Sequence, residues 1–125
     1  MLFGTHFHQI DAKGRVRIPP KFKDVLGSIM ISKGSDGCLF LFNADEFKQQ
    51  LGKKLNETDM FDTEGTRQLR SVFSSAFELE EDASGRSLLP KALRETTKLE
   101  KDVVFIGVGT RVELWSKEEW DRYQG

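Results

Sequence analysis

Apolar side chains cluster in four short stretches of this chain, at residues 28–33, 38–42, 102–107 and 111–115. Short apolar clusters bounded by turn residues are typical of β-strands with a buried face. A Gly-containing turn separates the first two stretches, and another separates the last two. The pattern therefore predicts two β-hairpins. Further extended segments are expected at 3–10, 15–18, 77–81 and 86–89.

Helical signals lie between these strands. Pro19 and Pro90 stand where a first helical turn tolerates a missing N–H, and short helices are expected to run to about Leu26 and Thr97. Two further helices are expected after the hairpins, capped by Asn43 and Ser116, each with a Glu three residues later. In the middle of the chain, an apolar stripe predicts a helix that packs one face against the protein. The stripe consists of Leu69, Val72, Phe73 and Ala76.

The chain also resembles itself. The segment Asp11-Ala12-Lys13-Gly14-Arg15-Val16-Arg17-Ile18-Pro19 reappears as Asp82-Ala83-Ser84-Gly85-Arg86-Ser87-Leu88-Leu89-Pro90, and the flanking segments match in the same order. In both copies the Asp is expected to cap a tight turn in which the Gly takes a positive φ. We interpret the chain as a duplication with repeat 1 at about 1–47, a helical connector at about 48–75 and repeat 2 at about 76–125.

A unit of forty residues is too small to bury both faces of its own sheet. The two copies are therefore expected to close over one shared core in a single domain covering 1–125. The predicted fold is α+β: a small interleaved barrel of pseudo-twofold symmetry, flanked by helices. In this arrangement the two Asp-X-X-X-Arg turns emerge near each other on one side.

Composition and charge narrow the function classes. The 125 residues have a net charge of −1, yet residues 1–34 carry six Lys and Arg side chains against two Asp. This basic end can present a positive field to phosphate. No apolar run approaches the roughly 20 residues of a membrane span, the N-terminus lacks the pattern of a signal peptide, and the single Cys38 suits a reducing compartment. We expect a cytoplasmic protein with no membrane partner.

The strongest candidate for a DNA contact is Arg15, because Lys13 and Arg17 lie within two residues of it. Arg can bind guanine through two hydrogen bonds in the major groove, whereas Lys mainly contacts phosphate. Arg17 is expected to face the same side as Arg15. The alternative for Arg15 is a salt bridge to Asp11 that only closes the turn.

Arg86 repeats this position next to serines and an acidic run. It remains a candidate DNA contact, but its surroundings favour a stabilising pair, with Asp82 as the expected partner. The acidic run itself is either a solvated strand face or a docking surface for the basic end of a neighbouring subunit. It comprises Glu78, Glu80, Glu81 and Asp82.

The doubled Asp-X-X-X-Arg motif, with its Arg-X-X-Ile-Pro and Arg-X-X-Leu-Pro continuations, resembles the MraZ family across essentially the whole chain. Modules of that family belong to the AbrB-type swapped-hairpin superfamily, which implies a double-split barrel. The resemblance implies a sequence-specific transcriptional regulator that binds repeated boxes upstream of the division and cell-wall gene cluster. It also implies a ring-like homo-oligomer and association with the nucleoid. The alternative is an antitoxin-like protein-interaction module of the same superfamily.

Other chemistry has weaker support. His6 and His8 share a strand face, but no third His or Cys lies near them in sequence, so we expect no metal site. Gly107-Val108-Gly109 is interpreted as a hairpin turn and Cys38 as a small core residue. The sequence contains no motif that would bring a nucleophile, a general base and oxyanion-hole donors together. We therefore predict no enzyme activity, no cofactor and no small-molecule substrate.

Overall fold

The computed structural model describes all residues from 1 to 125 and has an α+β fold with one large antiparallel sheet. The sheet has six strands in the order β1-β7-β8-β4-β3-β5, so the hairpin β7-β8 lies between β1 and β4, and strands from the two halves of the chain are interleaved. A second, two-stranded sheet pairs β2 with β6. The strands are β1 (Thr5–Gln9), β2 (Arg15–Val16), β3 (Ile29–Lys33), β4 (Leu39–Asn43), β5 (Phe77–Glu78), β6 (Ser87–Leu88), β7 (Asp102–Val108) and β8 (Arg111–Ser116).

The chain also forms five helices. The Asn43 side chain accepts a hydrogen bond from the backbone N of Glu46, and the Ser116 hydroxyl accepts one from the backbone N of Glu119, which confirms both predicted caps. None of the helices is long and apolar enough to cross a lipid bilayer. The helices are α1 (Pro20–Leu26), α2 (Ala44–Glu57), α3 (Thr63–Ser75), α4 (Lys91–Thr96) and α5 (Lys117–Gln124).

One hydrophobic core joins the two halves of the chain. Ile31 and Leu41 from β3 and β4 pack in the same cluster as Phe105 and Leu114 from β7 and β8, and all four are fully buried. Burying a side chain of this size contributes roughly 1.5–3 kcal/mol. Leu89, which directly follows β6, is also fully buried in this cluster. The core therefore anchors the strands from which the two Asp-X-X-X-Arg turns emerge.

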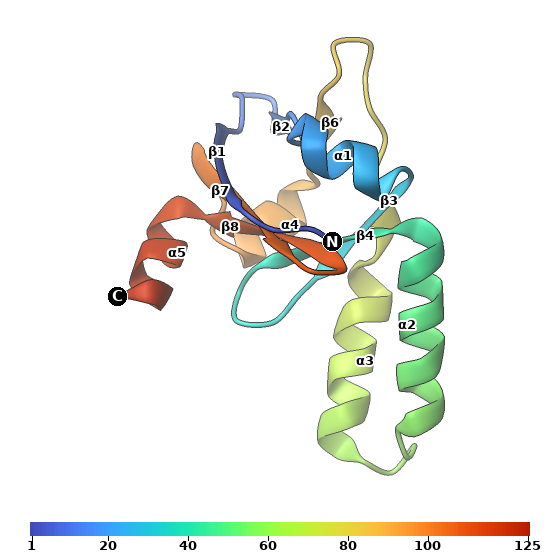
Figure 1. The fold of residues 1–125 in the computed structure, drawn as a ribbon. Helices are drawn as coiled ribbons and strands as arrows, with labels where there is room; N and C mark the ends of the chain where they lie inside the picture. Colours follow the sequence, from blue (N-terminus) through green and yellow to red (C-terminus); the bar gives the residue numbers. More distant parts are fainter.

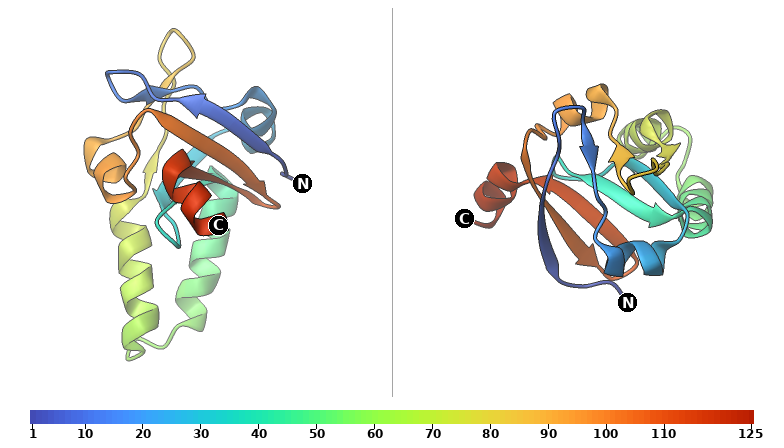
Figure 2. Two further views of the ribbon diagram at one scale, coloured as in Figure 1. Left: turned by 90° about the vertical axis from the view of Figure 1, so that its left-hand side faces the viewer. Right: turned by 90° about the horizontal axis from the view of Figure 1, so that it is seen from above.

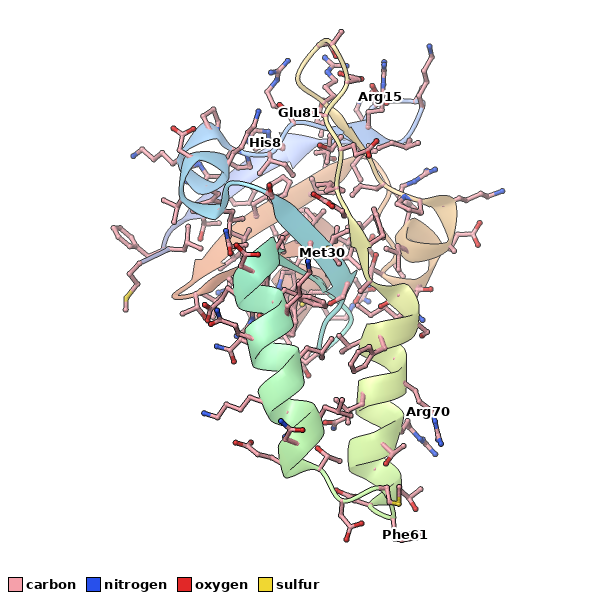
Figure 3. The ribbon with its side chains drawn as sticks, turned by 90° about the vertical axis from the view of Figure 1, so that its right-hand side faces the viewer. His8, Arg15, Met30, Phe61, Arg70 and Glu81 are labelled. Atoms are coloured by element: carbon pink, nitrogen blue, oxygen red, sulfur yellow. The ribbon has the colours of Figure 1, made fainter.

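Helices α2 and α3 form a hairpin that projects away from the sheets (Figure 1). The predicted apolar stripe lies on α3, but no residue of that helix is buried. Phe73 is half exposed, and Phe61 in the connection between the helices is 85% exposed. Figure 3 shows Phe61 at the tip of the hairpin, at the opposite end of the molecule from Arg15. The stripe is thus only partly covered within one chain.

The α+β class and the two predicted β-hairpins are confirmed, with strand ends within about one residue of those expected. The turn between β7 and β8 lies at Gly109 and Thr110, whereas Gly107 and Val108, which were predicted to belong to the turn, are the last residues of β7 and pair with β8. Three of the predicted extended segments are shorter than expected, since the strands β2, β5 and β6 each contain only two residues. The six-stranded sheet is open, with β1 and β5 at its edges, so the closed double-split barrel stays a prediction.

Candidate nucleic-acid interface

The two Asp-X-X-X-Arg turns have the same local hydrogen bonds. In the first turn, Asp11 Oδ1 accepts from the backbone N of Lys13 and of Arg15, both at 2.9 Å. In the second turn, Asp82 Oδ1 accepts from the backbone N of Ser84 at 2.9 Å and of Arg86 at 3.0 Å. Each Asp therefore caps its own turn, as the sequence predicts.

A glycine closes each turn in the left-handed region. Gly14 has φ of 83° and Gly85 has φ of 81°, values that L side chains rarely adopt. Both glycines also lie against a guanidinium. A Cβ built on Gly14 would stand 2.7 Å from Cζ of Arg94, and one built on Gly85 would stand 2.8 Å from NH1 of Arg17. The glycines thus provide both the turn geometry and the space for these arginines.

The two turns are joined side by side. Strands β2 and β6 pair Arg15 with Leu88 and Val16 with Ser87, and the backbone N of Leu89 donates to the carbonyl O of Gly14 at 2.9 Å. Figure 2 shows the two loops side by side at one end of the molecule. The pairing confirms that the two motifs emerge together.

Ion pairs cross from one turn to the other. Arg15 Nε donates to Asp11 Oδ2 at 2.9 Å, and Arg15 NH1 donates to Asp82 Oδ2 at 3.3 Å. Arg86 NH1 donates to Asp11 Oδ2 at 3.1 Å. The salt bridge between Arg15 and Asp11, which the sequence offered as the alternative to a DNA contact, is therefore present. Arg86 also makes an ion pair, but its guanidinium pairs with Asp11 and not with Asp82 as predicted. The reason is that the β2–β6 ladder brings the side chains of opposite turns together.

This network strongly favours the ionised form of both aspartates. The backbone hydrogen bond from Arg15 is the largest cause that lowers the pKa of Asp11 to about 2, with help from the Arg15 side chain and the backbone of Lys13. The Ser84 hydroxyl, followed by the backbone N of Arg86, lowers the pKa of Asp82 to about 2. Both carboxylates therefore remain charged at neutral pH and neutralise much of the charge on Arg15 and Arg86.

The remaining two candidate residues are exposed and have no ion pair. Lys13 lies in the first turn, and its side chain is free of protein partners. Arg17 donates from NH2 to the carbonyl O of Ser84 at 2.8 Å, so its guanidinium lies against the second turn without meeting a carboxylate. Arg15 and Arg17 line the same shallow groove, which agrees with the prediction that they face one side.

That groove contains residues that the sequence did not single out as DNA contacts. Glu100 and Lys101 contribute to it from the connection between α4 and β7, and His8 and Gln9 contribute from β1. Glu100 and Lys101 are far from the first turn in sequence, and their residue types alone carry no signal for a site. Only the pairing of β1 with β7 brings them beside Asp11.

The other segments considered for function have structural partners. Glu81 of the acidic run forms an ion pair with Lys23 of α1 in the same chain, so this carboxylate is already engaged.

His6 lies edge-on to Phe22, and His8 lies edge-on to Phe105. Burial is the main cause that lowers the pKa of His8, followed by the charges of His6 and Arg17. Cys38 is a buried core residue as predicted, and burial raises the pKa of its thiol to about 12.

Together, the fold and this surface define a small α+β protein in which two interlocked Asp-capped turns present cations at one end. The family model of the MraZ protein, which its description also calls antitoxin-like, matches residues 1–71 and again residues 72–125. The chain belongs to the MraZ family.

Similar proteins cover nearly the same length. A protein of Caldanaerobacter subterraneus subsp. tengcongensis is 47% identical over 124 residues, which make up 98% of this chain and 86% of the relative. A protein of Acetivibrio thermocellus is 44% identical over 126 residues, with 100% of this chain and 87% of the relative covered. A protein of Carboxydothermus hydrogenoformans is 44% identical over 124 residues, with 98% and 86% covered. Each of these relatives is named "Transcriptional regulator MraZ".

Proposed function

We propose that this chain is a transcriptional regulator that binds duplex DNA with the end of the molecule that carries the two turns. The observation that carries the proposal is the pairing of the turns, which holds Arg15 and Arg17 in one groove, while Lys13 is exposed in the first turn. A surface whose backbone is fixed by hydrogen bonds loses little freedom when it binds. The name shared by the relatives supports the same function.

The roles of the candidate residues follow from their partners. Lys13 and Arg17 have no ion pair and contact phosphate, while Arg15, half-exposed in the groove, reads a base edge. Arg86 contributes mainly by holding the first turn through Asp11. As the family resemblance implies, the target is a set of repeated boxes upstream of the division and cell-wall gene cluster, bound in the cytoplasm at the nucleoid.

A band-shift titration tests this function. The labelled duplex carries the region upstream of the chain's own operon, and a matched duplex of unrelated sequence and equal length serves as the control. We expect tighter binding to the upstream duplex at moderate salt and a steep loss of affinity as salt rises. Equal affinity for both duplexes would contradict a sequence-specific regulator.

The regulator is further proposed to act as a ring-like homo-oligomer, which would engage several boxes at once. The exposed apolar side chains of the α2–α3 hairpin support self-association, because clustered exposed apolar side chains mark interaction sites. They include Leu55, Met60, Phe61 and Phe73. Light scattering of the purified chain at micromolar concentration should give the mass of a multimer. A monomeric mass would exclude the ring.

An antitoxin-like interaction module is the second candidate, and the description of the family model favours it. Such a module would use the hairpin to bind a different protein, and DNA binding by the paired turns would not be required. A chain that binds neither duplex above background in the band-shift titration, while folded, would favour this alternative.

A further inference from the structure

Two shallow grooves flank the paired turns, and their charges differ. The first groove, beside the first turn, contains four cationic side chains and two carboxylates: Arg15, Arg17, Arg86 and Lys101, with Asp11 and Glu100. The second groove, beside the second turn, contains Lys23 with Glu78 and Glu81. Lys23 there is already paired with Glu81. The second groove thus has an excess of negative charge, and the first groove has an excess of positive charge.

Within the first groove, the free positive charge comes from only two residues. The charges of Arg15 and Arg86 are opposed by Asp11 and Asp82 at distances of 2.9 to 3.3 Å. Arg17 meets only the carbonyl O of Ser84, and the Lys101 ammonium has neither an ion pair nor a side-chain hydrogen bond.

The backbone fixes Lys101 next to the first turn. The carbonyl O of Lys101 accepts a hydrogen bond from the backbone N of Ile10 at 2.8 Å, and Ile10 directly precedes the capping residue Asp11. Lys101 also directly precedes β7, whose pairing with β1 continues from this point. Its side chain is exposed, so the ammonium is available to solvent and to ligands. A lysine from the far end of the chain is therefore held at the edge of the first groove.

We propose that Lys101 and Arg17 form a phosphate-binding site in the first groove, and that the DNA backbone runs over this groove and avoids the second. The inference rests on the proposed DNA-binding function. Phosphate contacts of this type fix the position of a protein on the duplex without reading its sequence. Glu100 lies in the same groove, and its negative charge weakens the site. The carboxylates of the second groove repel phosphate on that side.

Three variants test the site. Lys101→Ala removes the proposed contact, Glu100→Gln removes the opposing charge, and Lys53→Ala removes one exposed positive charge from α2, outside both grooves. The dissociation constant is measured between about 50 and 200 mM salt for the upstream duplex and for the unrelated duplex. Lys101→Gln serves as a second variant if Lys101→Ala does not fold, and thermal unfolding of every variant checks the fold.

Lys101→Ala should lower the slope of log Kd against log salt by about 0.9, with about a fivefold weaker affinity near 0.15 M salt. The loss of affinity should be equal for the upstream and the unrelated duplex, because a phosphate contact carries no sequence information. Glu100→Gln should strengthen binding, and Lys53→Ala should leave the slope unchanged. An unchanged slope for Lys101→Ala, while the wild-type chain binds the upstream duplex, overturns this inference alone. Absence of binding by the wild-type chain overturns the proposed function instead.

Discussion

The guanidinium of Arg86 and the carboxylate of Asp11 belong to different turns, yet they form an ion pair of 3.1 Å. Asp11 Oδ2 also accepts from Arg15 Nε at 2.9 Å, so one carboxylate serves the arginines of both motifs. Asp82 receives only one guanidinium, that of Arg15. The two motifs are therefore similar in sequence but unequal in the network that joins them.

This inequality predicts different effects of removing the two carboxylates. Asp11→Asn should lower the melting temperature by several degrees more than Asp82→Asn, because it removes two ion pairs and leaves Arg86 without a counter-charge. Asp82→Asn removes one ion pair, and Arg15 stays paired with Asp11. Asparagine keeps an oxygen that can cap the turn, so the comparison isolates the charge. Thermal unfolding by circular dichroism measures both variants. Equal losses would show that the additional ion pair between Asp11 and Arg86 contributes no measurable stability.

The network also predicts how stability depends on pH. The pKa of Asp11 and of Asp82 is about 2 in the folded protein, against 3.8 for an ordinary Asp. Because the folded pKa is the lower one, the unfolded chain takes up protons first as the pH falls. The stabilisation is therefore fully present above the ordinary value and is lost as the pH falls to about 2. Urea unfolding at a series of pH values should show this loss. In a variant with both Asp→Asn changes, the free energy of unfolding should depend less steeply on pH.

The two motif arginines should differ in both stability and DNA binding. Arg15→Ala breaks pairs with Asp11 and Asp82, whereas Arg86→Ala breaks only the pair with Asp11, so Arg15→Ala should lower the melting temperature more. Arg15 thus stabilises the fold as well as offering a DNA contact, because it joins the two turns.

Arg15→Ala should also weaken specific DNA binding by about 1–3 kcal/mol through loss of a base contact, and Arg86→Ala should weaken it less. Arg67→Ala on α3 removes an exposed arginine that has no ion pair and should alter neither property. Melting temperature and duplex affinity, measured on all three variants, separate the two roles. A larger loss of affinity for Arg86→Ala than for Arg15→Ala would reverse these assignments.

Alanine substitutions at Gly85 and Gly37 distinguish the effect of backbone strain from the effect of moving the Arg17 side chain. Gly85 and Gly37 have φ of 81° and 84°, so alanine at either position should cost about 1–2 kcal/mol of stability. A Cβ at Gly85 would also press on the Arg17 guanidinium, whereas nothing lies within 4 Å of a Cβ at Gly37. Gly85→Ala should therefore weaken DNA binding beyond its effect on stability, and Gly37→Ala should affect stability only. Matching affinities in the two variants would mean that the position of Arg17 does not matter for binding.

The sequence alone determined the local features of this protein. The caps at Asn43 and Ser116, the turns at Asp11 and Asp82 and the two hairpins were predictable, because each depends on hydrogen bonds between residues close in the chain. The doubled Asp-X-X-X-Arg motif likewise indicated the MraZ family from the sequence alone.

Only the tertiary structure decided which side chains meet across the turns. The partners of Arg15 and Arg86 in the opposite turn lie 67 and 75 residues away, and no local pattern encodes such a choice. The sequence also did not reveal Lys101, whose residue type is ordinary and whose place beside Asp11 results from the pairing of β1 with β7. Contacts of this kind depend on how the shared core folds the chain, since a side chain's charge acts over a few ångströms in space and not along the sequence.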